Sequence, residues 1–112
     1  MEDDRLPTDI WVMAYVRRAN DAGIGAYVVR KGARMGGTVL VKVTQPESGC
    51  RVLSQVRDLD GNLAWMAAHG AEPVSEAEAD AYIARAVGRD PDVWVVEFED
   101  REGRHPFDGK EL

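Results

Sequence analysis

Apolar residues recur at helical spacing in two segments of the chain. The first is predicted to begin at Thr8 as its N-cap and to end near Ala22-Gly23, because glycine accepts the left-handed conformation that closes helices. Two adjacent lines run along this helix: Ile10, Met13, Ala14 and Arg17, and Trp11, Ala14, Tyr15 and Arg18. The second helix is predicted to begin at Ser75, with Glu78 completing a capping box. Its inward stripe comprises Ala79, Tyr82, Ile83, Ala86 and Val87.

Strand patterns fill most of the chain between these helices. Residues 25–30 and 38–44 flank a glycine-rich loop, which predicts a hairpin. Residues 50–57 and 63–67 follow through short turns, so the whole reads as an antiparallel meander. Within 38–44 three valines alternate with Leu40, Lys42 and Thr44, which predicts one buried face and one largely exposed face.

A last strand, near residues 93–99, is apolar on both faces at its start and is therefore expected in the interior of the sheet. The predicted fold class is α+β, with a mainly antiparallel four- to five-stranded sheet and both helices packed on one face. We expect residues 1–112 to form a single domain, with poorly ordered ends at 1–6 and 105–112.

Composition fits one ordinary globular domain. The chain has 112 residues, of which 45% are hydrophobic and 30% charged. Its apolar runs are too short to cross a bilayer, and its acidic start is unlike a secretion signal. The single cysteine, Cys50, suits a reducing compartment. These features predict a cytoplasmic protein without a membrane partner.

Charge is divided unevenly along the chain. The net charge is −6, yet residues 1–57 hold nine Lys/Arg against six Asp/Glu, and residues 58–112 hold five against fourteen. The acidic total makes nucleic acid an unlikely partner, because that affinity comes mainly from neutralising phosphates. The asymmetry predicts either oppositely charged contact faces or an ordinary solvated surface.

Three segments resemble one known family: Trp11–Arg18 in the first helix, Glu78–Arg85 in the second, and Asp90–Glu97 continuing to His105. The sequence is similar to domain-of-unknown-function family 1491, short single-domain proteins found mostly in alphaproteobacteria. The resemblance covers nearly the whole chain. It implies a small bacterial domain and supplies no activity, cofactor or partner.

Candidate chemistry is sparse. Gly36-Gly37-Thr38 lacks the lysine and the following helix of a phosphate-binding loop, so these are interpreted as turn glycines. No motif surrounds Cys50 to make it a nucleophile. A mixed metal site is conceivable at Glu97, Glu99 and His105, with Arg101 or Arg104 as an anion clamp; the alternative is a solvated strand end.

The tryptophans are candidates for a core or an interface. Trp11 and Trp94 lie in strongly patterned elements and are predicted to be core residues. Trp65, on a short strand after a turn, is predicted to reach the surface and mark an interface.

The leading functional hypothesis is a non-catalytic interaction module, acting as a homo-oligomer or an adaptor, with no cofactor. Its basic contact set is Arg17, Arg18, Arg30, Lys31 and Arg34, and the acidic set is Glu97, Glu99, Asp100 and Glu102. The alternative is a small metal-dependent hydrolase-like enzyme using Glu97, Glu99 and His105. A nucleic-acid binder working through the basic N-terminal half is the least favoured hypothesis.

Overall fold

A computed structural model describes residues 7–105, 107 and 109–112, and it has two helices and one mixed sheet of six strands. Helix α1 spans Thr8–Asp21 and helix α2 spans Glu76–Arg89. The strands are β1 (Gly25–Arg30), β2 (Val39–Gln45), β3 (Gly49–Arg57), β4 (Leu63–Ala67), β5 (Trp94–Glu99) and β6 (Lys110–Glu111). The predicted α+β class is confirmed, although the sheet has more strands than expected and includes parallel pairs.

The sheet order is β1-β5-β2-β3-β4-β6. Strands β2, β3 and β4 form the expected antiparallel meander, but β5 lies between β1 and β2, antiparallel to the first and parallel to the second. The predicted hairpin of 25–30 with 38–44 is therefore wrong. The interior position predicted for the strand near residues 93–99, which is β5, is confirmed. A strand that is apolar on both faces needs cover on both sides.

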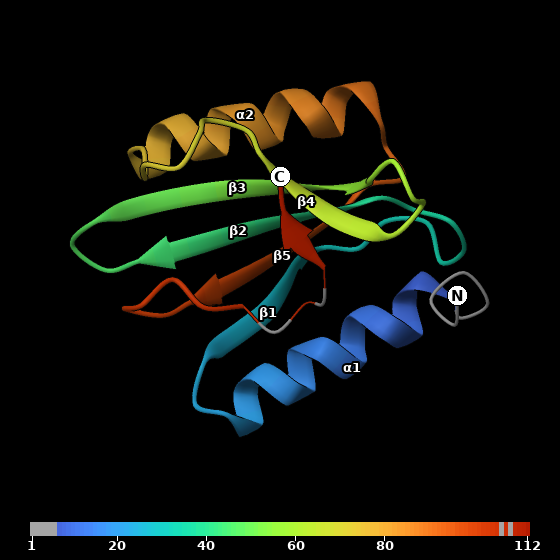
Figure 1. The fold of residues 1–112 in the computed structure, drawn as a ribbon, viewed down its shortest axis with the longest axis horizontal. Coiled ribbons are helices and arrows are strands. Elements are labelled where there is room, and N and C mark those ends of the chain that lie inside the picture. Colours follow the sequence, from blue (N-terminus) through green and yellow to red (C-terminus); the bar gives the residue numbers. More distant parts are fainter. Residues whose placement is uncertain (1–6, 106, 108) are drawn as a thin grey trace.

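The two helices cover opposite faces of the sheet, so their predicted placement on one face is wrong (Figure 1). Helix α1 packs on the face that carries Val41 and Val96. Helix α2 packs on the face that carries Leu40 and Val95. The second face is consequently not exposed, and even Lys42 is buried there.

The loop between β1 and β2 packs tightly on the start of β5. A Cβ on Gly32 would lie 2.7 Å from Trp94 Cδ1, so only glycine permits this approach. The Trp94 indole nitrogen then donates to the carbonyl oxygen of Ala33 at 2.7 Å. This contact fixes the loop beside the end of β1.

The helix ends follow the expected rules in part. Pro7 occupies the N-cap position of α1, and Thr8 is its first helical residue rather than its cap. Gly23, at φ 84°, closes the turn after α1. Ser75 caps α2 as predicted, because its hydroxyl accepts the Glu78 amide hydrogen at 3.1 Å.

The C-terminal segment packs against the domain. Phe107 is buried against Trp11, Trp65 and Phe98, and β6 pairs in parallel with β4. The described residues of 105–112, which were expected to belong to a poorly ordered end, thus pack on the sheet, and residues 1–6 lie outside the described part. No described helix is long and apolar enough to cross a membrane.

Candidate functional site

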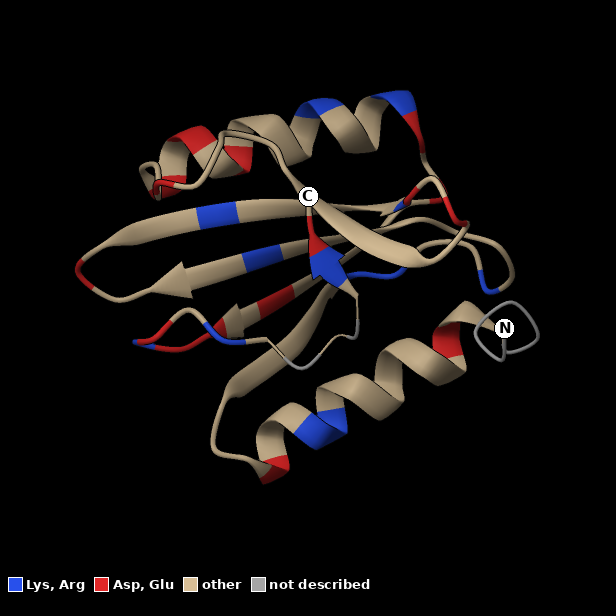
Figure 2. Cartoon of the chain, viewed as in Figure 1, with Lys and Arg blue, Asp and Glu red and all other residues tan. Residues whose placement is uncertain are grey.

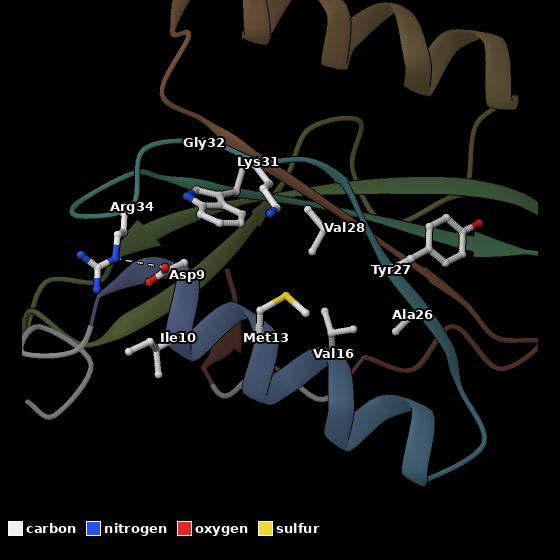
Figure 3. A pocket seen from close by; sticks show the side chains of 11 residues that line it. Asp9, Ile10, Met13, Val16, Ala26, Tyr27, Val28, Lys31, Gly32 and Arg34 are labelled. Atoms are coloured by element: carbon white, nitrogen blue, oxygen red, sulfur yellow. Dashed lines mark hydrogen bonds and ion pairs between the residues drawn. The ribbon is translucent and has the colours of Figure 1, made fainter.

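A candidate site formed by described residues is a hollow of about 780 Å³ between α1 and β1 (Figure 3). Val16, Ala26, Val28 and Trp94 supply its apolar walls and floor. Each of these side chains has a structural reason to be there, since Val16, Ala26 and Trp94 belong to the core and Val28 packs against it. The hollow is thus a place where the core reaches the surface.

Two apolar side chains of α1 stand at the rim of this hollow. Ile10 is 51% exposed and Met13 is 48% exposed, and both lie on the side of the helix turned away from the sheet core. In Figure 3 the thioether of Met13 points up into the hollow. Two half-exposed apolar side chains next to an apolar cavity are typical of contact surfaces.

One end of the hollow is charged. Arg34 Nε lies 3.2 Å from Asp9 Oδ2, and the amide of Thr8 donates to the Arg34 carbonyl oxygen at 2.7 Å. These contacts join the β1–β2 loop to the start of α1. Lys31 also lines this end, its ammonium pointing into the hollow, and it forms no ion pair with any described residue (Figure 3).

Strand β1 is an edge of the sheet, and among the described residues the side chain of Asn20 covers part of its outward main chain. The Ala26 amide donates to Asn20 Oδ1 at 3.1 Å, and Asn20 Nδ2 donates to the Ala26 carbonyl oxygen at 3.2 Å. Since main-chain direction alternates along a strand, Val28 also turns its N–H and C=O outward. No described strand lies on that side, because β1 is first in the sheet order, and outside the sheet no described residue forms a main-chain hydrogen bond with Val28.

The opposite edge of the sheet is better covered. Strand β6 pairs with β4, and the amide of Leu112 donates to the Trp65 carbonyl oxygen at 2.8 Å. Arg51 holds β6 with two hydrogen bonds to Glu111, at 3.1 and 2.9 Å. The edge at β1 is therefore the more accessible template for another strand.

The structure divides the predicted basic set. Figure 2 shows basic positions toward the C-terminal end of α1, and others in the β1–β2 loop near its N-terminal end. Arg18 lies over the Tyr15 ring at 4.6 Å, and Arg17 lines a second hollow beside Met13. Arg30 donates to main-chain carbonyl oxygens of Pro91 and Val93. Only Lys31 and Arg34 of this set lie at the α1–β1 hollow.

The predicted acidic set is also divided. Asp100 accepts hydrogen bonds from the Arg104 side chain and amide, and these contacts hold the pKa of its carboxyl well below the usual range. Glu102 lies 3.3 Å from Arg104 Nε. Glu99 is exposed, whereas Glu97 is buried on the α2 face. Glu99, Asp100 and Glu102 thus line one hollow together with Arg101 and Arg104, and Glu97 lies apart from them.

Glu97 belongs to a polar cluster at the start of α2, in which Lys42 and Glu97 are buried and Glu76 and Asp80 are exposed. Lys42 Nζ lies 2.8 Å from both Glu76 and Asp80 on the helix, and 3.9 Å from Glu97. Burial alone would lower the pKa of Lys42, but the hydrogen bonds to Asp80 and Glu76 outweigh it and raise the pKa above its ordinary value. This cluster anchors α2 to the sheet.

Tyr27, at the edge of the sheet, is also affected by nearby carboxylates. Burial and the charges of Glu97 and Glu99 raise the pKa of Tyr27. Its ring is 46% exposed on the α2 side of β1 and, in Figure 3, points away from the α1–β1 hollow. Tyr27 therefore contributes main chain, rather than its ring, to the candidate site.

The predicted metal cluster does not assemble. His105 stacks on Phe98 at 6.4 Å between ring centres, which places it on the α1 side of the sheet, opposite Glu97. Burial lowers the pKa of His105. Among the described residues no three His, Cys, Asp or Glu side chains are grouped to hold a metal ion. Cys50 is buried, with Sγ 3.6 Å from Thr44 Oγ1.

The tryptophan predictions are partly confirmed. Trp11 and Trp94 are core residues as expected, but Trp65 is fully buried, so its predicted surface position is wrong. The reason is the C-terminal segment, since Phe107 and His105 pack on the indole. The residues missed from the sequence are Ile10, Met13, Asn20 and Val28. The apolar line through Ile10 and Met13 was a usable signal, but nothing local shows that β1 is an edge.

Comparison with known proteins identifies relatives. The family model described as "Protein of unknown function (DUF1491)" matches residues 6–108. None of the curated proteins matches the chain. A DUF1491 family protein from Caulobacter crescentus CB15 is similar at 44% identity in two structures, which cover 96% of this chain.

The structural likeness is close. The Caulobacter crystal structure has a TM-score of 0.84 with 99% of its chain covered, and its NMR structure has 0.83 with 96% covered. Protein Atu0922 from A. tumefaciens is similar at 25% identity, with a TM-score of 0.72 and 86% of each chain covered. Because the family model spans nearly all of the sequence, the chain belongs to the DUF1491 family of proteins of unknown function.

Proposed function

We propose that this protein is a non-catalytic interaction module that binds an extended segment of a protein partner along β1, with the apolar side chains of that segment seated against α1. The observation that carries the proposal is the unpaired main chain of Val28 beside an apolar hollow. Strand addition at a sheet edge gives affinity through main-chain hydrogen bonds and specificity through alternate side chains.

The surface around β1 supports this proposal. Ile10 and Met13 flank the hollow on the α1 side, and Val28 lines it from β1 itself. An added strand bonds to the edge and covers apolar area at the same time. The hydrogen-bonding edge and the apolar rim are therefore one contact surface, which we call the α1–β1 groove.

The enzyme alternative has less support. Its three proposed ligands lie on two faces of the sheet, and the most buried of them, Glu97, is engaged by Thr44 Oγ1 at 2.7 Å. Operation in the cytoplasm remains part of the proposal, and the free thiol of Cys50 fits a reducing compartment.

A peptide-display selection on the purified chain tests the proposal, followed by NMR titration of selected peptides into the labelled protein. We expect the amide shifts to concentrate at Ala26–Arg30 and along the outer side of α1. Met13→Ser should weaken binding several-fold, because it removes an apolar wall.

Met66→Ser is the matched control, since Met66 is 49% exposed but lies on β4, near the other edge. It should leave peptide affinity unchanged. Shifts confined to other elements, or equal losses in the two serine variants, would contradict the proposal.

A further inference from the structure

We infer that the α1–β1 groove selects segments in which an apolar residue and a carboxylate stand two positions apart. This inference rests on the proposed function and adds the chemistry of the partner. The carboxylate is recognised by Lys31, and the apolar side chain fills the hollow at Val28.

A β-bulge in β1 brings Lys31 to this face. Val28 pairs with Val96 and Arg30 pairs with Val95, so two residues of β1 oppose one of β5. In a regular strand Val28 and Lys31, three residues apart, would point to opposite faces. The bulge removes one step of that alternation, and Lys31 joins Val28 on the α1 side. Figure 3 shows both side chains at the hollow.

The positions of the partner's side chains follow from strand geometry. A residue directly opposite Val28 in the added strand points to the same face as Val28, and therefore into the hollow. Its neighbours point to the other face, and the residues two positions away point back to the α1 side. Lys31 directly follows the last residue of β1, and with the bulge counted as one step it stands two steps beyond Val28. The partner residue that it meets is therefore two positions from the apolar one.

The charge of Lys31 determines the chemistry of the partner residue that it meets. Arg34 is already paired with Asp9, whereas Lys31 has no ion pair with a described residue. An ammonium at the end of an apolar groove favours a carboxylate there and disfavours a cation. A glutamate or aspartate, or a terminal carboxylate, supplies the complementary charge.

Asn20 limits the length of the partner segment that can pair with β1. Its side-chain amide already occupies the outward groups of Ala26, two residues before Val28. An added strand is thus paired at Val28 and extends toward Lys31 rather than along the whole of β1. A short motif, and not a long strand, is the unit that this edge recognises.

The test uses blocked heptapeptides of threonine that carry one leucine and one glutamate, titrated into the whole labelled protein by NMR. Glutamate two positions from leucine, in at least one of the two orders, should bind about fivefold more tightly than its glutamine analogue at low salt. Moving the glutamate next to the leucine should remove the difference. The preference should weaken as salt is added.

Lys31→Glu should reverse the preference, favouring a lysine peptide over the glutamate peptide. Lys110→Glu is the control, because Lys110 is exposed on the opposite edge of the sheet, and it should leave the preference intact. Equal binding of the glutamate and glutamine peptides at β1 would overturn the motif and leave the proposed strand addition standing. No shift at β1 with any of these or with display-selected peptides would overturn both.

Discussion

The side-chain amide of Asn20 forms two hydrogen bonds with the main chain of Ala26, at 3.1 and 3.2 Å, and so takes the place of a neighbouring strand at the sheet edge. The last turn of α1 thereby closes the first part of β1. The remaining edge, at Val28, is left for a partner. Edge strands are usually protected in this manner, because unpaired edges template aggregation.

Asn20→Ala should therefore lower the free energy of unfolding by about 1 kcal/mol, since two main-chain groups at a partly exposed edge lose their partner. It should also raise the tendency to aggregate. Urea unfolding and light scattering measure the two effects. Asn20→Asp keeps the acceptor for the Ala26 amide and loses the donor, so it should fall between wild type and Asn20→Ala.

Lys42→Ala should destabilise the protein by about 3 kcal/mol, because it leaves Glu97 buried without its cation and frees Glu76 and Asp80 at the start of α2. Chemical denaturation gives the value. The double variant Lys42→Met, Glu97→Gln should recover much of the loss, since it removes the buried charge together with its partner. A Lys42→Met variant as stable as wild type would contradict this account of the cluster.

Acidification should destabilise the fold through His105. Burial, with a smaller contribution from the Arg51 charge, holds the pKa of His105 below the ordinary value of 6.5. The unfolded chain therefore takes up the proton first, so stability is full above about pH 6.5 and falls as the pH drops toward the lower folded pKa. Melting temperatures of wild type and His105→Gln across this range test the prediction.

The His105→Gln variant should lose the fall in stability below about pH 6.5, whereas His69→Gln should retain it. His69 is the appropriate control because it packs edge-on against Tyr82, on the α2 side of the sheet. Identical pH profiles for wild type and His105→Gln would contradict the prediction.

Phe107→Ala should cost about 3 kcal/mol or more, because the ring is buried among Trp11, Trp65 and Phe98. It should also loosen β6 and expose the edge of β4. Hydrogen exchange at Leu63–Ala67 measures this second effect. Unchanged exchange there, despite lost stability, would show that the ion pair of Arg51 with Glu111 holds β6 without the ring.

The sequence predicts elements better than their arrangement. The Ser75 cap, the stripe of α2 and the β2–β3–β4 meander follow from neighbouring residues, and they are confirmed, whereas the predicted Thr8 cap is wrong by one residue. The place of β5 between β1 and β2 depends on contacts between distant segments, which no local pattern records. Because β5 lies beside β2, the apolar side chains of these strands point to both faces of the sheet. Each face needs cover, and one helix packs on each.

At the candidate site, too, the sequence predicts some residues, but their positions depend on distant segments of the chain. Lys31 was identified as a basic contact residue from charge alone, but its direction depends on a bulge that only the pairing with β5 reveals. Trp65 was placed at the surface because the turn before it looks exposed, whereas the distant Phe107 covers it. The solvated strand end considered as the alternative for Glu97 is also wrong, because Glu97 is buried beside Thr44 and Lys42 on the α2 face.

The insertion of β5 between β1 and β2 also affects the order in which parts of the domain can fold during synthesis. The partners of β1 lie about seventy residues later in the chain, so α1 and β1 leave the ribosome long before the strand that holds them exists. Pairing over such a separation closes a long loop and is slow. The edge at Val28 thus takes its final shape only after β5 has been made, whereas the strands of the β2–β3–β4 meander pair with close neighbours in the sequence.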